Sequence, residues 1–139
     1  MPTKNYTLEF RGYWRFANLY SIPNEAGIYC TYTCTYNEKG DTVSIDKLIY
    51  IGEAKLVHDR IVNHEHMPVW DLRLSGSQEL CFSFAPILHE SDRKRAEAAL
   101  IYAHKPPLNK KYVYRFPFER TIVAVYGKCE KLSQSDVNP

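Results

Sequence analysis

The side chains that could carry chemistry in this sequence form one ordered series. Two tyrosines come first, each in a triplet with an isoleucine and a glycine, and a glutamate and an asparagine come last. An arginine binds a phosphate through parallel hydrogen bonds, a carboxylate binds a hard cation, and a tyrosine or a histidine can take a proton. Together these residue types could bind a phosphate and a cation and move a proton. The series is Tyr29, Tyr50, Lys55, Arg60, His64, Glu97 and Asn109.

The two tyrosines belong to strands that the sequence predicts on either side of one loop. Residues 27–36 alternate as a strand does, with Tyr29 on one face. Residues 37–41 are typical of a hairpin loop, and residues 43–51 form the second strand. A glycine beside a tyrosine marks a place where another group approaches the backbone closely. We therefore expect the hairpin to bring Tyr29 and Tyr50 together.

A helix is predicted over residues 54–65. Positions three and four apart share a helix face, so Arg60 and His64 would lie one turn apart on the side that faces the sheet. The position of Arg60 and His64 can be interpreted in two ways. They belong to a functional site, or they form a structural ion pair with Glu53. Pro68 should end the helix, because a proline disfavours helical geometry in the residue before it.

A second helix is predicted over residues 92–103, with Ser91 as its N-cap. Glu97 lies in the most apolar part of this helix. A carboxylate in such surroundings should be paired with a cation or bound to a metal. The prolines within residues 104–110 stop the helix and fix the direction of Asn109.

The remaining segments complete the expected fold. Residues 80–87 alternate as a third strand, and residues 121–126 are a candidate for a last one. The aromatic residues 6–22 form a strand or a short helix, whose rings either pack on the core or stack on bases. Residues 69–77 are a connector, and residues 130–139 a polar, frayed tail. The expected fold class is α/β (α+β), a small central antiparallel sheet of about three strands flanked by helices.

Length and composition are those of one soluble domain. Of the 139 residues, 45% are apolar and 24% are charged. We expect a single domain over residues 1–139, with a core of about 26–111 and with 5–22 and 121–126 as additions. No apolar run reaches the length of a membrane span, and the N-terminus lacks the core of a signal peptide. The four cysteines show no tight pairing pattern, so free thiols in a cytoplasmic protein are expected, with disulfides as the alternative.

The charge is unevenly distributed although the net charge is only +2. Residues 92–115 hold seven basic and two acidic side chains, whereas residues 25–53 hold five acidic and two basic ones. A basic region can hold phosphates electrostatically. The alternative interpretation is a solvated helix surface.

The ordered residues resemble the pattern of the GIY-YIG nuclease superfamily. That pattern begins with a GIY and a YIG triplet, matched by Gly27-Ile28-Tyr29 and Tyr50-Ile51-Gly52. An arginine and a histidine four residues later follow on a helix, then a glutamate on a second helix, then an asparagine after a turn that contains proline. Arg60, His64, Glu97 and Asn109 match these positions. The resemblance covers residues 27–111.

The resemblance implies cleavage of DNA that depends on a divalent metal, Mg²⁺ or Mn²⁺, held by Glu97. Arg60 would bind the phosphate, and Tyr50 would position the water or the phosphate. Tyr29 is the implied general base, and it would need Lys55 or Arg60 nearby to lower a pKa of about 10. His64 is a rival base or a proton relay. Asn109 would orient side chains or the scissile strand.

Three features depart from the family or leave its function open. Residues 35–47 make the loop between the tyrosines longer than usual, Glu53 stands where the family often has a small hydroxyl residue, and no targeting domain follows. A restriction-type endonuclease is the first expectation and a mobile-element or repair nuclease the second, with a homodimer to cut both strands. A non-catalytic nucleic-acid-binding module is the alternative from another class.

Overall fold

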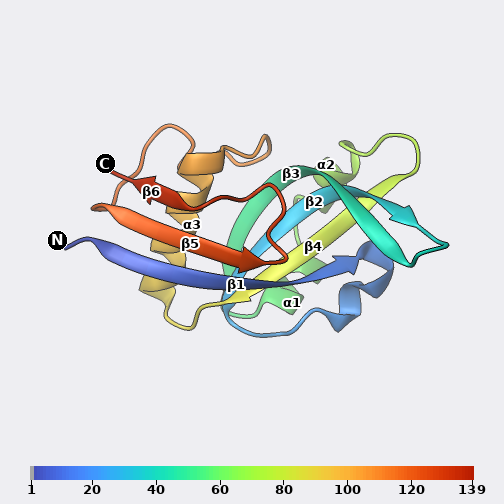
Figure 1. Cartoon of the computed structure of the whole chain (residues 1–139), viewed down its shortest axis with the longest axis horizontal. Coiled ribbons are helices and arrows are strands. Elements are labelled where there is room, and N and C mark those ends of the chain that lie inside the picture. Colours follow the sequence, from blue (N-terminus) through green and yellow to red (C-terminus); the bar gives the residue numbers. More distant parts are fainter. Residues whose placement is uncertain (1) are drawn as a thin grey trace.

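One six-stranded sheet runs through the protein, whose computed structural model describes residues 2–139. The strands lie in the order β3-β2-β4-β1-β5-β6 (Figure 1). Neighbouring strands are antiparallel except β1 and β5, which are parallel. The strands are β1 Lys4–Arg15, β2 Gly27–Asn37, β3 Thr42–Ala54, β4 Gln78–Pro86, β5 Thr121–Gly127 and β6 Ser135–Val137.

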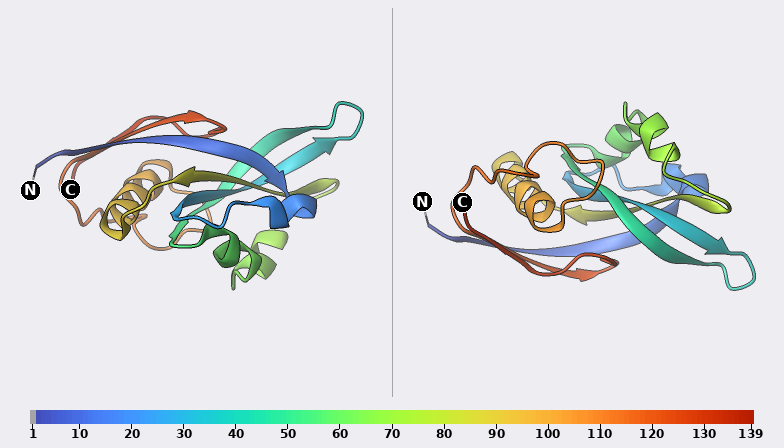
Figure 2. Two further views of the ribbon diagram at one scale, coloured as in Figure 1. Left: turned by 90° about the horizontal axis from the view of Figure 1, so that it is seen from below. Right: turned by 90° about the horizontal axis from the view of Figure 1, so that it is seen from above.

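The helices lie on the two faces of this sheet. The sheet curls so that one face wraps around the longest helix, α3, while the shorter helices lie on the opposite face (Figure 2). The helices are the 3-10 helix η1 Phe16–Ser21, α1 Val57–Val62, α2 Met67–Asp71 and α3 Glu90–His104.

Each face of the sheet carries its own hydrophobic core. Strand β2 alternates as predicted, so Ile28 and Cys30 point toward α3, whereas Tyr29 points toward α1 and α2. On the α3 side these residues meet Leu100 and other apolar side chains of the helix. On the opposite side the buried rings include Trp70 of α2. Strands β3 and β4 pair with the two edges of β2 and a hydrophobic core covers each of its faces, so its whole first half is buried.

The predicted fold class, with a central sheet of about three strands flanked by helices, is wrong. The sheet has six strands of mixed direction and forms a curled half-barrel with few helices. The N-terminal aromatic segment is the main cause, because it forms the long strand β1 in the middle of the sheet. Leu8 and Phe10 of β1 are buried, and they lie opposite Val125 and Gly127 of β5. The same segment also forms η1. The strand prediction therefore holds for one part of residues 6–22, and the prediction of a short helix holds for another part.

The predicted frayed tail is also wrong over Ser135–Val137. These residues pair with β5 as strand β6, with Val137 opposite Thr121. The side chains of Ser135 and Val137 are buried. A short polar sequence carries little strand signal by itself, and the pairing partner decides its structure.

The helix predicted over residues 54–65 is much shorter than expected. Strand β3 continues through Ala54, which lies opposite Gly27, and only α1 is helical. His64 therefore lies in the turn after α1, where its N–H donates to the carbonyl oxygen of Ile61. Pro68 does not stop a helix but stands in the first turn of α2, where its missing N–H costs nothing.

The second predicted helix is present as α3, and it begins two residues before the predicted start. His89 is its N-cap, so the prediction of Ser91 in that role is wrong. The predicted strands at residues 80–87 and 121–126 are confirmed as β4 and β5. All four cysteines are free, as expected. No helix within residues 2–139 is both long enough and apolar enough to cross a membrane.

Candidate active site

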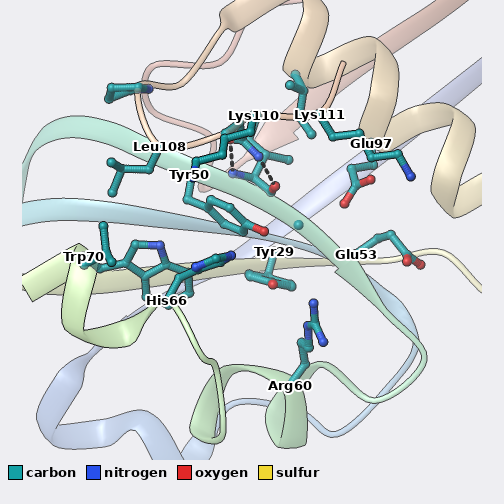
Figure 3. A pocket seen from close by; sticks show the side chains of 16 residues that line it. Tyr29, Tyr50, Glu53, Arg60, His66, Trp70, Glu97, Leu108, Lys110 and Lys111 are labelled. Carbon is teal, nitrogen blue, oxygen red and sulfur yellow. Dashed lines mark hydrogen bonds between the residues drawn. The ribbon is translucent and has the colours of Figure 1, made fainter. Parts of the chain in front are cut away.

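A cavity of about 390 Å³ opens at the edge of the sheet beside β3. It receives side chains from both faces, because β3 is the last strand and its residue Gly52 has no side chain to close the gap. Tyr29, Arg60 and Trp70 reach it from one face, and Glu97 of α3 reaches it from the other (Figure 3). Residues 107–111, which follow α3, form the remaining wall.

The two tyrosines meet at the centre of the cavity. Tyr29 lies opposite Gly52 in the pairing of β2 with β3, and its ring centroid is 6.2 Å from that of Tyr50. A Cβ atom on Gly52 would come within 2.3 Å of Cζ of Tyr29. The glycine is therefore required for the tyrosine ring to lie across β3. The prediction that the hairpin brings Tyr29 and Tyr50 together is confirmed.

Glu97 points into the cavity without an ion pair, among the residues that the structure describes. The pKa of Glu97 is raised to about 8, chiefly by burial and next by the negative charge of Glu53. Lys111 and Arg60 oppose it, but they are too distant to form ion pairs with the carboxylate. A carboxylate in this state gains stability from any cation that enters the cavity.

Glu53, the residue that departs from the family pattern, has its charge balanced by Arg93. The Nε atom of Arg93 lies 2.9 Å from Oε1 of Glu53, and both side chains are largely buried. The proposed structural pair between Arg60 and Glu53 is therefore not formed, since Glu53 is held by a different arginine. Arg60 forms no ion pair among the residues that the structure describes.

Arg60 lies beside Tyr29, where its positive charge favours the ionised form of the tyrosine hydroxyl. Burial raises the pKa of Tyr29 above its ordinary value, and the hydrogen bond from Arg60 opposes this increase without overcoming it. Burial also raises the pKa of Tyr50, with the charge of Glu97 as the next cause. Both hydroxyls are therefore protonated at neutral pH when the cavity holds no further cation. Lys55 does not line the cavity, and its side chain is exposed.

His64 is buried behind the cavity wall and does not line it. Its Nδ1 atom accepts a hydrogen bond of 3.0 Å from the backbone N–H of His66. The pKa of His64 is lowered to about 4, chiefly by burial and to a smaller extent by the charges of Arg60 and His66. A neutral ring that accepts at Nδ1 carries its proton on Nε2. His64 therefore has no free lone pair with which to act as a base in this conformation.

Asn109 is bound to the edge of β3. Its Oδ1 atom accepts from the N–H of Ile51 at 2.9 Å, and its Nδ2 atom donates to the carbonyl oxygen of Ile51 at 2.9 Å. The N–H of Leu108 also donates to the carbonyl oxygen of Ile49. These bonds pair an otherwise open strand edge and fix the loop that carries Lys110 and Lys111 into the cavity wall.

The basic stretch of residues 92–115 divides into internal and accessible cations. Arg93 holds Glu53, and Arg95 is buried with its Nε atom 2.7 Å from Oγ1 of Thr121. Lys110 and Lys111 are exposed and line the cavity. The stretch is therefore neither a uniform phosphate-binding region nor simply a solvated helix surface. Part of its positive charge is structural, and part is accessible at the cavity.

Sequence reasoning missed several residues of the cavity. His66 and Trp70 fall where it expected a helix stop and a connector, so neither had a predicted position relative to the tyrosines. Sequence reasoning included Lys110 and Lys111 only as part of the basic stretch of residues 92–115 and predicted no position for them at the cavity. Their position directly after Asn109 was the signal that could have identified them.

Residues 2–139 contain no group of three or more His, Cys, Asp or Glu side chains that could hold a metal ion. A metal in this cavity would therefore rely on Glu97, with water and substrate oxygens as its other ligands. Mg²⁺ accepts such a site, because it keeps several waters and uses one or two carboxylates together with phosphate oxygens. The unpaired, partly buried carboxylate of Glu97 fits this requirement.

The chain matches no family model, no curated protein and no solved structure. What the protein does is therefore inferred from the residues of the cavity and from the order in which they occur.

Proposed function

We propose that this protein is an endonuclease that hydrolyses phosphodiester bonds of DNA with the help of a divalent metal. One observation carries the proposal: an unpaired carboxylate, Glu97, shares a small cavity with Arg60 and with two tyrosine hydroxyls. The resemblance of the ordered residues to the GIY-YIG nucleases gives further support. The proposal depends on the site and not on the predicted fold class, which was wrong.

Each side chain has a task in this reaction. Arg60 would bind the nonbridging oxygens of the scissile phosphate, which its planar guanidinium suits. Tyr29 would hold the attacking water and take its proton, and Tyr50 would orient the same water or the phosphate. Lys110 and Lys111 would attract the DNA backbone. Asn109 would act indirectly, by holding β3 and the lysine loop in place.

The metal, Mg²⁺ or Mn²⁺, would be held by Glu97. When bound, it would supply positive charge that stabilises the transition state and the departing 3′ oxygen. Positive charge beside Tyr29 would also favour the ionised form of its hydroxyl. This would add to the effect of Arg60, which alone does not offset burial.

A cleavage experiment tests the proposal. Supercoiled plasmid is incubated with the wild type, with Glu97→Gln and with the surface control Glu9→Gln, in Mg²⁺, in Mn²⁺ and in a chelator. We expect the wild type and Glu9→Gln to cut only with metal, and Glu97→Gln to cut at least about 100-fold more slowly while still binding DNA. Wild-type rates in Glu97→Gln would contradict the proposal, and so would the absence of metal-dependent cutting of both the plasmid and a duplex that carries a single bulged nucleotide.

The form of the products tests the finer expectations. Discrete fragments would indicate a restriction-type enzyme, whereas a smear would indicate an enzyme without sequence preference. We further propose that the partner is DNA and that a homodimer cuts both strands. The free cysteines are compatible with action in the cytoplasm.

A further inference from the structure

The cavity has a polar end and an aromatic end. Figure 3 shows Glu53 and Glu97 at one end, His66 and Trp70 at the other, and the two tyrosines between them. The proposed reaction uses the polar end. It gives no task to the aromatic end, where Val69 and Leu108 also line the wall.

The aromatic end is partly open: the rings of Tyr50 and His66 are only partly buried, whereas Trp70 is fully buried, with its ring centroid 4.3 Å from that of His64. Trp70 and His66 both lie close to Tyr50, with ring centroids 5.3 Å and 6.0 Å from it. His66 is only half-buried, and Val69 is 45% exposed at the rim. Partly exposed ring faces such as those of Tyr50 and His66 bind nucleobases by stacking, whatever the base.

A second observation also indicates a ligand. Trp70 lines the cavity although it is fully buried, and its Nε1 atom has no hydrogen-bond partner within residues 2–139. A buried indole N–H usually has a partner, since leaving it unpaired costs free energy. A carbonyl oxygen or a ring nitrogen of a base would accept this hydrogen bond.

We propose that the aromatic end of the cavity binds an unpaired nucleobase next to the scissile phosphate. A base within a duplex is stacked and paired, so it cannot enter a cavity of about 390 Å³ beside the strand edge. The preferred substrate is therefore DNA with an unpaired nucleotide at the cut, rather than a continuous duplex. This inference rests on the proposed nuclease function, which locates the phosphate at Arg60 and Glu97.

Binding measured without cleavage tests the subsite. The probes are three duplexes of one sequence: one fully paired, one with a single bulged 2-aminopurine, and one with an abasic site at the same bulge. The protein is Glu97→Gln, and wild type in a chelator serves as a second form. We expect the bulged base to be bound about tenfold more tightly than the abasic bulge, with its fluorescence quenched by stacking.

Two variants in the Glu97→Gln background assign the preference to this end of the cavity. His66→Ala should reduce the tenfold ratio to less than threefold, and Trp70→Phe, which keeps a ring but loses the N–H, should reduce it in part. The control is Tyr20→Ala, which removes an aromatic ring that is 77% exposed on η1, and it should keep the full ratio. Circular dichroism checks that each variant is folded.

The outcomes separate this inference from the proposed function. Equal binding of the bulged base and the abasic bulge overturns the subsite, even if the wild type cuts paired DNA with Mg²⁺. A folded His66→Ala protein with an unchanged ratio overturns it as well. A tenfold preference that depends on His66, in a protein that cuts no DNA, supports the subsite and refutes the nuclease.

Discussion

At the scale of single residues, Glu97 and Glu53 show how similar side chains acquire different roles. Arg93 holds Glu53 in a largely buried ion pair, which leaves Glu53 a structural part of the wall. Glu97 lies in the same cavity without such a pair, and its pKa is raised to about 8. The difference lies in the partner and not in the residue type. Glu97 is therefore the carboxylate available to a ligand.

The raised pKa of Glu97 predicts how stability depends on pH. The value in the folded state exceeds the ordinary value of 4.5, so the folded protein loses stability as the pH rises from about 4.5 to about 8. Without metal, Glu97→Gln should unfold with a free energy higher than the wild type by on the order of 2 kcal/mol at pH 8, after allowance for solvent screening. The gain should fall below about 1 kcal/mol at pH 5.

Urea unfolding at both pH values, with and without Mg²⁺, measures this effect. Mg²⁺ should stabilise the wild type at pH 8 and leave Glu97→Gln unchanged, because only a carboxylate binds the ion. Glu9→Gln, a change on an exposed side chain of β1, is the control and should show neither effect. An equal response of all three proteins to pH and to Mg²⁺ would exclude Glu97 as a buried metal ligand.

At the scale of elements, the site depends on the edge of β3. Gly52 gives space to the ring of Tyr29, and Asn109 pairs the open edge at Ile51. The first contact places a hydroxyl in the cavity, and the second places the lysine loop beside it. The geometry of the site is therefore built into β3 and its pairing on both edges.

Gly52→Ala tests this dependence. The added Cβ atom would come within 2.3 Å of Cζ and 2.4 Å of Oη of Tyr29, and the buried ring has to move. We expect a loss of about 1–3 kcal/mol in the free energy of unfolding and a loss of about 100-fold in the rate of cleavage. The rate should fall even under conditions in which the variant is fully folded.

Gly40→Ala is the matched control, because a Cβ atom there meets its nearest neighbour at 3.4 Å in the hairpin loop. It should change the free energy of unfolding by less than about 0.5 kcal/mol and leave cleavage unaffected. Urea unfolding and plasmid cleavage measure both quantities. Cleavage by Gly52→Ala at the wild-type rate would show that the position of Tyr29 does not matter.

At the scale of the whole molecule, the net charge of +2 is small, although positive charge is concentrated at one place on the surface. Several cations of the basic stretch are used inside the fold, as Arg93 and Arg95 are. Lys110 and Lys111 remain exposed at the cavity. DNA binding should therefore depend on these two lysines more than on the overall charge.

The salt dependence of DNA binding measures this contribution. In the double variant Lys110→Gln/Lys111→Gln, the slope of log Kd against log salt should decrease by up to about 2, since each phosphate contact contributes about 0.9. The control Lys4→Gln/Lys128→Gln removes the same charge from exposed positions away from the cavity, and it should change the slope little. Equal effects of the two double variants would indicate binding by overall charge alone.

The sequence by itself determined the elements whose patterns are local. The alternation of residues 27–36 predicted β2 and the face of Tyr29, and the hairpin that brings Tyr50 to Tyr29 followed from it. The helical spacing around Glu97 predicted α3 and a carboxylate in apolar surroundings. These predictions succeeded because periods of two and of 3.6 residues reflect which side of an element is buried.

Only the tertiary structure decided which distant segments pair. The parallel contact of β1 with β5, the strand β6, the bond of Asn109 to Ile51 and the ion pair of Arg93 with Glu53 join residues far apart in the chain. They also decided that His66 and not His64 lines the cavity. Their stability comes from complementary partners and shared burial, which no single segment encodes, so a sequence read locally cannot predict them.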